Sequence, residues 1–98
     1  MAYTITTTAG TTLASIADGT VNSTATSLTL IGKNYAGYGI FLNENYVKLL
    51  ENFNSSTEPS PPLKGQLWFD STNQLLKVYN GTIWKPISSS ASGATQPA

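Results

Sequence analysis

Two glutamates are the side chains of this sequence whose spacing best suits catalysis. Glu44 and Glu51 lie seven residues apart in a segment with helical periodicity, which predicts both on one helix face. Paired carboxylates can hydrolyse a glycosidic bond, one as the acid and the other as the base or nucleophile. The alternative is a solvated helix face. Lys48 favours it, because Glu44 and Lys48 have the i,i+4 spacing of a stabilising ion pair.

Composition argues against most other catalytic chemistry. The sequence contains no Cys and no His, so neither a thiolate nor a nucleophile–histidine pair can form. The acidic residues are too scattered for a calcium loop, and Asp70 is expected to cap a turn. We therefore expect no enzyme, no catalytic residue, no cofactor and no metal site.

The charged residues also bear on the partners. All five basic residues are lysines spread along the chain, so neither a bidentate arginine nor a basic patch is available to read nucleic acid. No apolar run approaches the ~18 residues that span a membrane. We expect neither nucleic-acid binding nor membrane insertion. Charged residues make up 10% of a chain with no net charge, so electrostatic self-repulsion is weak and association between copies is tolerated.

Aromatic residues near the C-terminal end provide a second kind of candidate site. Exposed aromatic faces can stack on sugars, which makes Tyr79 and Trp84 candidate contacts for a glycan. The competing interpretation assigns the large apolar residues of this region to a core or an interface between subunits, because large aromatic side chains dominate both. These residues are Trp68, Leu76, Val78 and Trp84. The second interpretation is favoured.

These aromatic residues belong to a predicted three-stranded β-meander at 65–87. Its strands are rich in β-branched and aromatic residues, and Asn80-Gly81 predicts a two-residue type I′ turn before the last strand. Pro86 near the end of the last strand indicates an edge strand or the exit from the strand. The predicted strands are 66–70, 74–79 and 82–87.

One segment, 40–53, has the pattern of a helix. Its apolar residues recur at spacings of four, three and four, which makes a single stripe. A helix of ~14 residues is marginal alone and must pack on something, either its own sheet or copies of itself. The predicted interface residues on this stripe are Leu42, Tyr46, Leu49 and Phe53.

The remaining segments complete a mainly β fold with one short α-helix. Partial alternation predicts a strand at 2–8, and Ser27–Ile31 is a further strand candidate. Between them, Thr12–Ile16 supplies the apolar residues Leu13 and Ile16, and Asp18-Gly19 marks a turn. The predicted organisation is an N-terminal β-rich anchoring segment at 1–34, a Gly/Tyr loop and helix at 35–53, a Pro/Ser linker at 54–64, the meander at 65–87 and a flexible low-complexity tail at 88–98. So small a core predicts that a partner subunit completes it.

Two motifs together suggest a family. The segments SLTLIGKNYAGYGIFLNENYVKLLENF (27–53) and PLKGQLWFDSTNQLLKVYNGTIWKPI (62–87) resemble a module of virion structural and tail-fibre-like proteins of tailed bacteriophages, notably phages of cyanobacteria. The MAYTI start is similar to the beginning of such proteins. The likeness extends over most of the chain up to Ile87.

This resemblance implies a non-enzymatic structural role in a virion. Such proteins tend to be homotrimers, and many carry a distal receptor-binding domain, whereas here only a low-complexity segment follows Ile87. The expected partners are other copies of the chain and tail or baseplate proteins, in a virion made in the host cytoplasm. The expected role is a short tail fibre, a fibre adaptor or a baseplate-attached protein. The alternatives are a module binding carbohydrate or host-surface polysaccharide through the Trp/Tyr meander, and a capsid or neck decoration protein.

Overall fold

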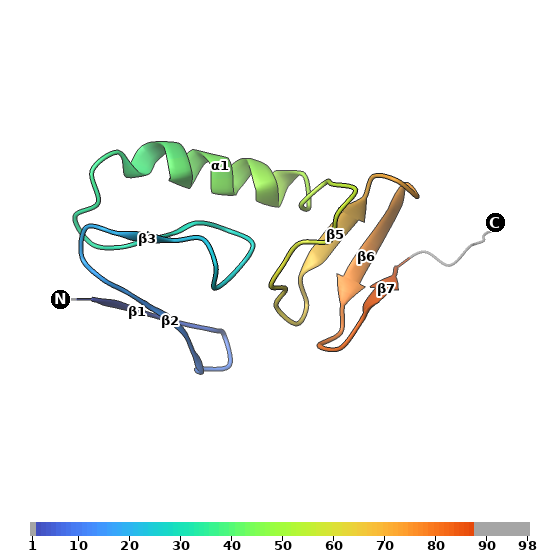
Figure 1. The fold of residues 1–98 in the computed structure, drawn as a ribbon. Coiled ribbons are helices and arrows are strands. Elements are labelled where there is room, and N and C mark those ends of the chain that lie inside the picture. Colours follow the sequence, from blue (N-terminus) through green and yellow to red (C-terminus); the bar gives the residue numbers. More distant parts are fainter. Residues whose placement is uncertain (1, 88–98) are drawn as a thin grey trace. The chain divides into compact units, whose positions relative to one another are not determined.

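The structure, a computed structural model, describes residues 2–87 and divides into two compact units, Met1–Val47 and Lys48–Ala98. The described residues form small antiparallel sheets and one helix, which confirms the predicted mainly β class with a short α-helix (Figure 1). The predicted flexible tail, 88–98, lies outside the described residues. The elements are β1 (Tyr3–Thr6), β2 (Thr12–Ile16), β3 (Val21–Asn22), β4 (Leu30–Ile31), α1 (Tyr38–Leu50), β5 (Leu67–Asp70), β6 (Leu75–Tyr79) and β7 (Trp84–Pro86).

The first unit begins with a hairpin of β1 and β2. Tyr3 pairs with Ile16 and Ile5 pairs with Ala14, so these side chains share one face of the hairpin. Ile16 is 1% exposed and is the most buried apolar residue of this unit. The hairpin therefore supplies the centre of the unit's small core.

The second pair of strands is shorter than predicted. Of the candidate strand Ser27–Ile31, only Leu30 and Ile31 are in β4, where they pair with β3. The reason is that backbone N–H and carbonyl groups of the preceding residues are hydrogen-bonded to side chains. Asn45 of α1 accepts a hydrogen bond from the Thr29 N–H (3.0 Å) and donates one to the Thr29 carbonyl (2.8 Å), and Thr26 Oγ1 accepts one from the Leu28 N–H.

The helix begins two residues earlier and ends three residues earlier than predicted. Asn52 and Phe53 have left-handed φ angles of 51° and 55°. The Phe53 N–H donates to the Lys48 carbonyl and the Asn52 N–H to the Leu49 carbonyl, which is the bonding of a Schellman C-cap. Phe53 therefore lies outside α1, and its predicted place on the helical stripe was wrong.

The second unit contains the predicted meander, with strand order β5-β6-β7. Figure 1 shows the three strands side by side, with β7 at one edge, as Pro86 predicted. The predicted two-residue type I′ turn was wrong: Tyr79 pairs with Trp84, so four residues form the loop. Asn80 explains this length, because its Oδ1 accepts hydrogen bonds from the N–H groups of Thr82 and Ile83.

Candidate functional site

The first candidate site is the apolar stripe of α1, here called the helix stripe, which comprises Leu42, Tyr46 and Leu49. These residues lie at i, i+4 and i+7, so they share one face of the helix. They are 36%, 55% and 49% exposed, and no residue of α1 is buried. Asn45, in the part of α1 that belongs to the first unit, makes two hydrogen bonds with the Thr29 backbone. The structure thus brings three of the four predicted stripe residues together and leaves them uncovered.

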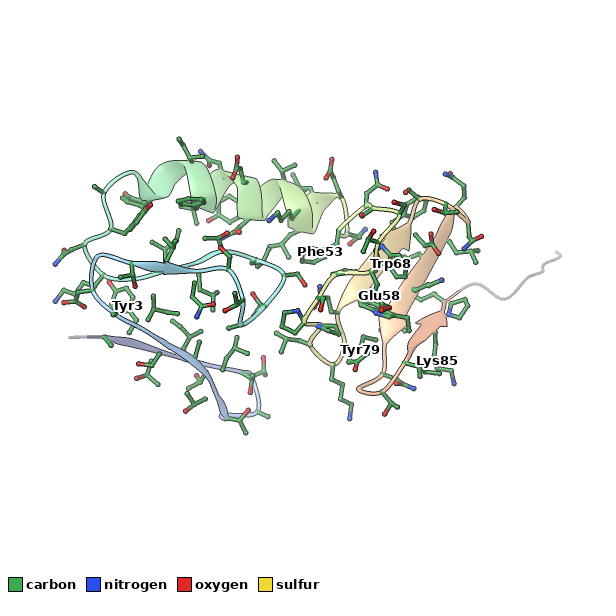
Figure 2. The ribbon with its side chains drawn as sticks, in the orientation of Figure 1. Tyr3, Phe53, Glu58, Trp68, Tyr79 and Lys85 are labelled. Atoms are coloured by element: carbon green, nitrogen blue, oxygen red, sulfur yellow. The ribbon has the colours of Figure 1, made fainter. Side chains whose placement is uncertain are left out.

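The second candidate site is one face of the meander, here called the aromatic face, formed by Trp68, Asp70, Lys77, Tyr79 and Trp84. The register pairs Trp68 with Lys77 and Tyr79 with Trp84, which places these side chains on the same side of the sheet. Figure 2 labels Trp68 and Tyr79. The rings of Trp68 and Trp84 are 5.4 Å apart in an edge-to-face arrangement, and those of Tyr79 and Trp84 are 5.2 Å apart.

Burial distinguishes these aromatic residues. Trp68 is 6% exposed, and its Nε1–H donates a hydrogen bond to the Ser55 carbonyl at 3.1 Å. Tyr79 and Trp84 are half-buried. Trp84 contacts Trp68 on one side and Tyr79 on the other, so the proposed glycan contacts Tyr79 and Trp84 are packed against each other. Trp68 is a core residue of its unit.

Val78 does not share this face. It pairs with Leu67, one position away from the Trp68–Lys77 pair, so its side chain lies on the opposite side of the sheet. Leu67, Phe69, Leu76 and Val78 are all half-buried on that side. Val78 was predicted to lie with Trp68 and Trp84. It is adjacent in β6 to Lys77 and Tyr79, the partners of these two tryptophans, so the alternation along the strand places it on the other face.

Asp70 forms a polar network at the end of the aromatic face. Its Oδ2 accepts hydrogen bonds from Lys77 Nζ and Asn73 Nδ2, both at 2.9 Å, and its Oδ1 accepts from the Thr72 and Asn73 N–H groups. Lys77 Nζ also lies 4.9 Å from the centre of the Trp68 ring, a cation–π geometry. Asp70 thus caps the turn, as expected, and a four-bond network joins that turn to β6.

The same bonds change the acidity of Asp70. The Lys77 ammonium, together with the Asn73 side chain, lowers the pKa of this carboxyl from 3.8 to about 2. A carboxyl with a lowered folded-state pKa stabilises the fold fully above its unfolded pKa. This contribution is lost as the pH falls from 3.8 toward 2.

We expect Asp70→Asn to remove this acid dependence. The difference in urea midpoint between the wild type and the variant should be largest above pH 4 and should shrink as the pH approaches 2, since the wild-type carboxylate is then protonated. Urea titrations followed by circular dichroism between pH 2 and pH 6 measure this difference. Glu58→Gln, at an exposed carboxyl of the same unit, is the control. A difference that does not vary with pH would contradict the assignment.

Glu44 and Glu51, the paired carboxylates considered for glycoside hydrolysis, do not lie on one face of α1. Glu44 is exposed on α1, and Glu51 is exposed beyond the end of the helix. Within residues 2–87, no group of three or more His, Cys, Asp or Glu side chains is placed to hold a metal ion. The same residues include no helix with both the length and the apolar character to cross a membrane.

The sequence analysis missed one feature of the first unit. A pocket of about 410 Å³ is lined by Tyr3, Ile31, Gly32, Asn34, Tyr35 and Tyr38. The tyrosine-rich sequence of residues 35–38 was a signal, but it was interpreted only as part of a Gly/Tyr loop. Tyr3, labelled in Figure 2, comes from the distant strand β1. Only the fold brings the three tyrosines together.

Comparison with known proteins adds no assignment: no family model, no curated protein and no solved structure matches this chain.

Proposed function

We propose that this protein is a non-enzymatic structural component of a phage virion that assembles as a homo-oligomer, most simply a trimer. Its place would be a short tail fibre, a fibre adaptor or a protein attached to the tail or baseplate. The proposal combines the resemblance of segments 27–53 and 62–87 to phage fibre modules with one structural observation, the uncovered helix stripe.

The helix stripe supports assembly because α1 is too short to be stable by itself. A helix of 13 residues is marginal in water, and helices of this length depend on burying an apolar face. Here no residue of α1 is buried, and Leu42, Tyr46 and Leu49 are each more than one-third exposed. Burying a half-exposed leucine contributes on the order of 1 kcal/mol, and an oligomer repeats this in every subunit.

The absence of net charge permits association between copies of the chain. The chain carries no net charge, so copies do not repel one another. Its cores are also small: Ile16 and Trp68 are the buried apolar residues among those the structure describes. Small domains with little core commonly gain their stability from subunit association.

The experiment has two parts. Light scattering after size exclusion is expected to give a trimer mass for the wild type, and Leu49→Lys is expected to shift it toward monomer, because a charge in a desolvated interface is strongly unfavourable. Asn43→Lys is the matched control, since Asn43 is an exposed polar residue of the same helix outside the helix stripe. A folded wild-type monomer at high concentration would contradict the homo-oligomer.

The virion role is tested separately, on particles of the phage that encodes the chain. Mass spectrometry of purified particles is expected to find the protein, and antibody labelling is expected to place it on the tail. Its absence from purified particles would contradict the virion role whatever the oligomeric state.

A further inference from the structure

The pocket of the first unit has walls of a consistent chemical kind. Tyr3 comes from β1, Tyr35 from the loop before the helix, and Tyr38 from the first residue of α1. Tyr3 and Tyr38 are 45% and 57% exposed, while Tyr35 is half-buried and packs on Phe41 with ring centres 5.8 Å apart. The pocket therefore combines exposed aromatic surface with phenol hydroxyl groups.

The remaining lining residues add one amide and no charge. Asn34 is the lining residue that carries a side-chain amide, and Ile31 and Gly32 complete the wall. Lys33 lies between two of these residues in sequence but does not line the pocket. A charged ligand would find no counter-charge among the lining residues, so it would lose hydration without compensation. The lining thus favours a neutral ligand with both apolar and hydroxyl surfaces.

One part of the pocket wall, the backbone at Gly32, is held in place before any ligand binds. The Gly32 N–H donates to the Thr20 carbonyl at 2.8 Å, and the Gly19 N–H donates to the Lys33 carbonyl at 2.7 Å. These bonds anchor the 32–34 segment to the turn that follows β2. A tyrosine side chain has few rotatable bonds, so ordering it on binding costs little entropy. A preformed wall of this kind reduces the free-energy cost of binding.

We propose that this tyrosine pocket binds a neutral sugar ring. A pyranose presents C–H groups on its faces, which pack on aromatic rings, and hydroxyl groups at its rim, which phenols and an amide can satisfy. A volume of about 410 Å³ falls in the range of small-molecule sites and accommodates one or two sugar rings. The inference is independent of the virion role and of the oligomeric state.

A proline-rich peptide is the main competitor, because such peptides also dock on aromatic residues. It needs a groove that follows an extended chain at about 3 Å per residue. The pocket here is lined by six residues, three of them with hydroxyl groups. These hydrogen-bonding groups favour the sugar.

The experiment follows the tyrosine ring signals by NMR during titration of the full chain. The probes are glucose, galactose, mannose, fucose, N-acetylglucosamine and their neutral disaccharides, with galacturonic acid and a polyproline peptide for comparison. At least one neutral sugar is expected to shift the ring signals of Tyr3, Tyr35 and Tyr38, with a dissociation constant on the order of millimolar. Galacturonic acid and the peptide are expected to leave them unchanged.

Two variants locate the binding. Tyr38→Ala is expected to weaken binding at least tenfold, whereas Ile40→Ala, at an exposed apolar residue of the same helix outside the pocket, is expected to leave it unchanged. Tyr38→Phe and Tyr79→Phe form a second pair, in which both aromatic rings are kept. Tyr38→Phe removes a hydroxyl group from the pocket, and Tyr79→Phe removes one from the aromatic face. A several-fold loss is expected for Tyr38→Phe alone.

Three outcomes would overturn the proposal. The first is that no neutral sugar shifts these signals, and the second is that the peptide shifts them instead. The third is that binding survives Tyr38→Ala but is lost in Tyr79→Phe, which would assign the sugar to the aromatic face.

Discussion

Trp68→Ala is expected to lower the free energy of unfolding of the second unit by about 3–5 kcal/mol, the usual range for removing a large buried aromatic side chain. Trp68 is 6% exposed, packs edge-to-face on Trp84 and bonds to the Ser55 carbonyl. It also lies beneath the Lys77 ammonium that pairs with Asp70. Since small domains have only about 5–15 kcal/mol of stability, much of this unit's stability would be lost.

Urea denaturation followed by the far-ultraviolet circular dichroism and by the fluorescence of the remaining Trp84 measures this loss. Trp84→Ala is the matched control, because Trp84 lies in the same cluster but is half-buried. Its effect should be clearly smaller. Equal losses for the two variants would show that Trp68 is not the core of the unit.

The second large effect is expected at Gly32 in the first unit. Gly32 is buried, and a Cβ at this position would overlap the Ala17 carbonyl oxygen and lie 2.8 Å from the Thr20 carbonyl oxygen. Both neighbours are backbone atoms that cannot rotate away, and the Thr20 carbonyl accepts the Gly32 N–H. Gly32→Ala is therefore expected to cost about 3 kcal/mol, at the upper end of overpacking effects.

Gly39→Ala provides the matched control for this substitution. Gly39 lies in α1, and nothing lies within 4 Å of the position its Cβ would take. Alanine there should stabilise the helix by about 0.5 kcal/mol through its higher helix propensity. Amide hydrogen exchange in β2 and β3 reports on the first unit in both variants. Unchanged protection in Gly32→Ala would contradict the close approach of these backbone segments.

The two substitutions also bear on the proposed sites. Gly32 belongs to the wall of the tyrosine pocket, so a shift of its backbone would displace Asn34 and Tyr35 as well. Trp68 supports Trp84, the residue first considered for glycan contact. A loss of sugar binding in either variant is therefore compared with the effects of Tyr38→Phe and Tyr79→Phe, which keep both rings and leave these contacts intact.

The local elements of this protein follow from patterns within short stretches of the sequence. The meander, the edge position of Pro86 and the existence of the helix could be predicted because hydrophobic periodicity, β propensity and proline geometry act over a few residues. The cap at Asp70 was predictable for the same reason, since an aspartate at a turn bonds to N–H groups two and three residues on. The ends of the helices and strands were less predictable, since the helix ends at Leu50 and excludes Phe53, which was predicted to belong to it.

Which residues share a surface depends on how distant segments pack in the folded protein. Asn45 holds the Thr29 backbone from sixteen residues away and so shortens a predicted strand. The pairing register places Val78 on the side opposite Trp68. Tyr3 lines the same pocket as Tyr35 and Tyr38, although it precedes them by about thirty residues in the sequence. Each of these results depends on contacts between distant segments, and periodicity within a single segment carries no information about which partner that segment will meet.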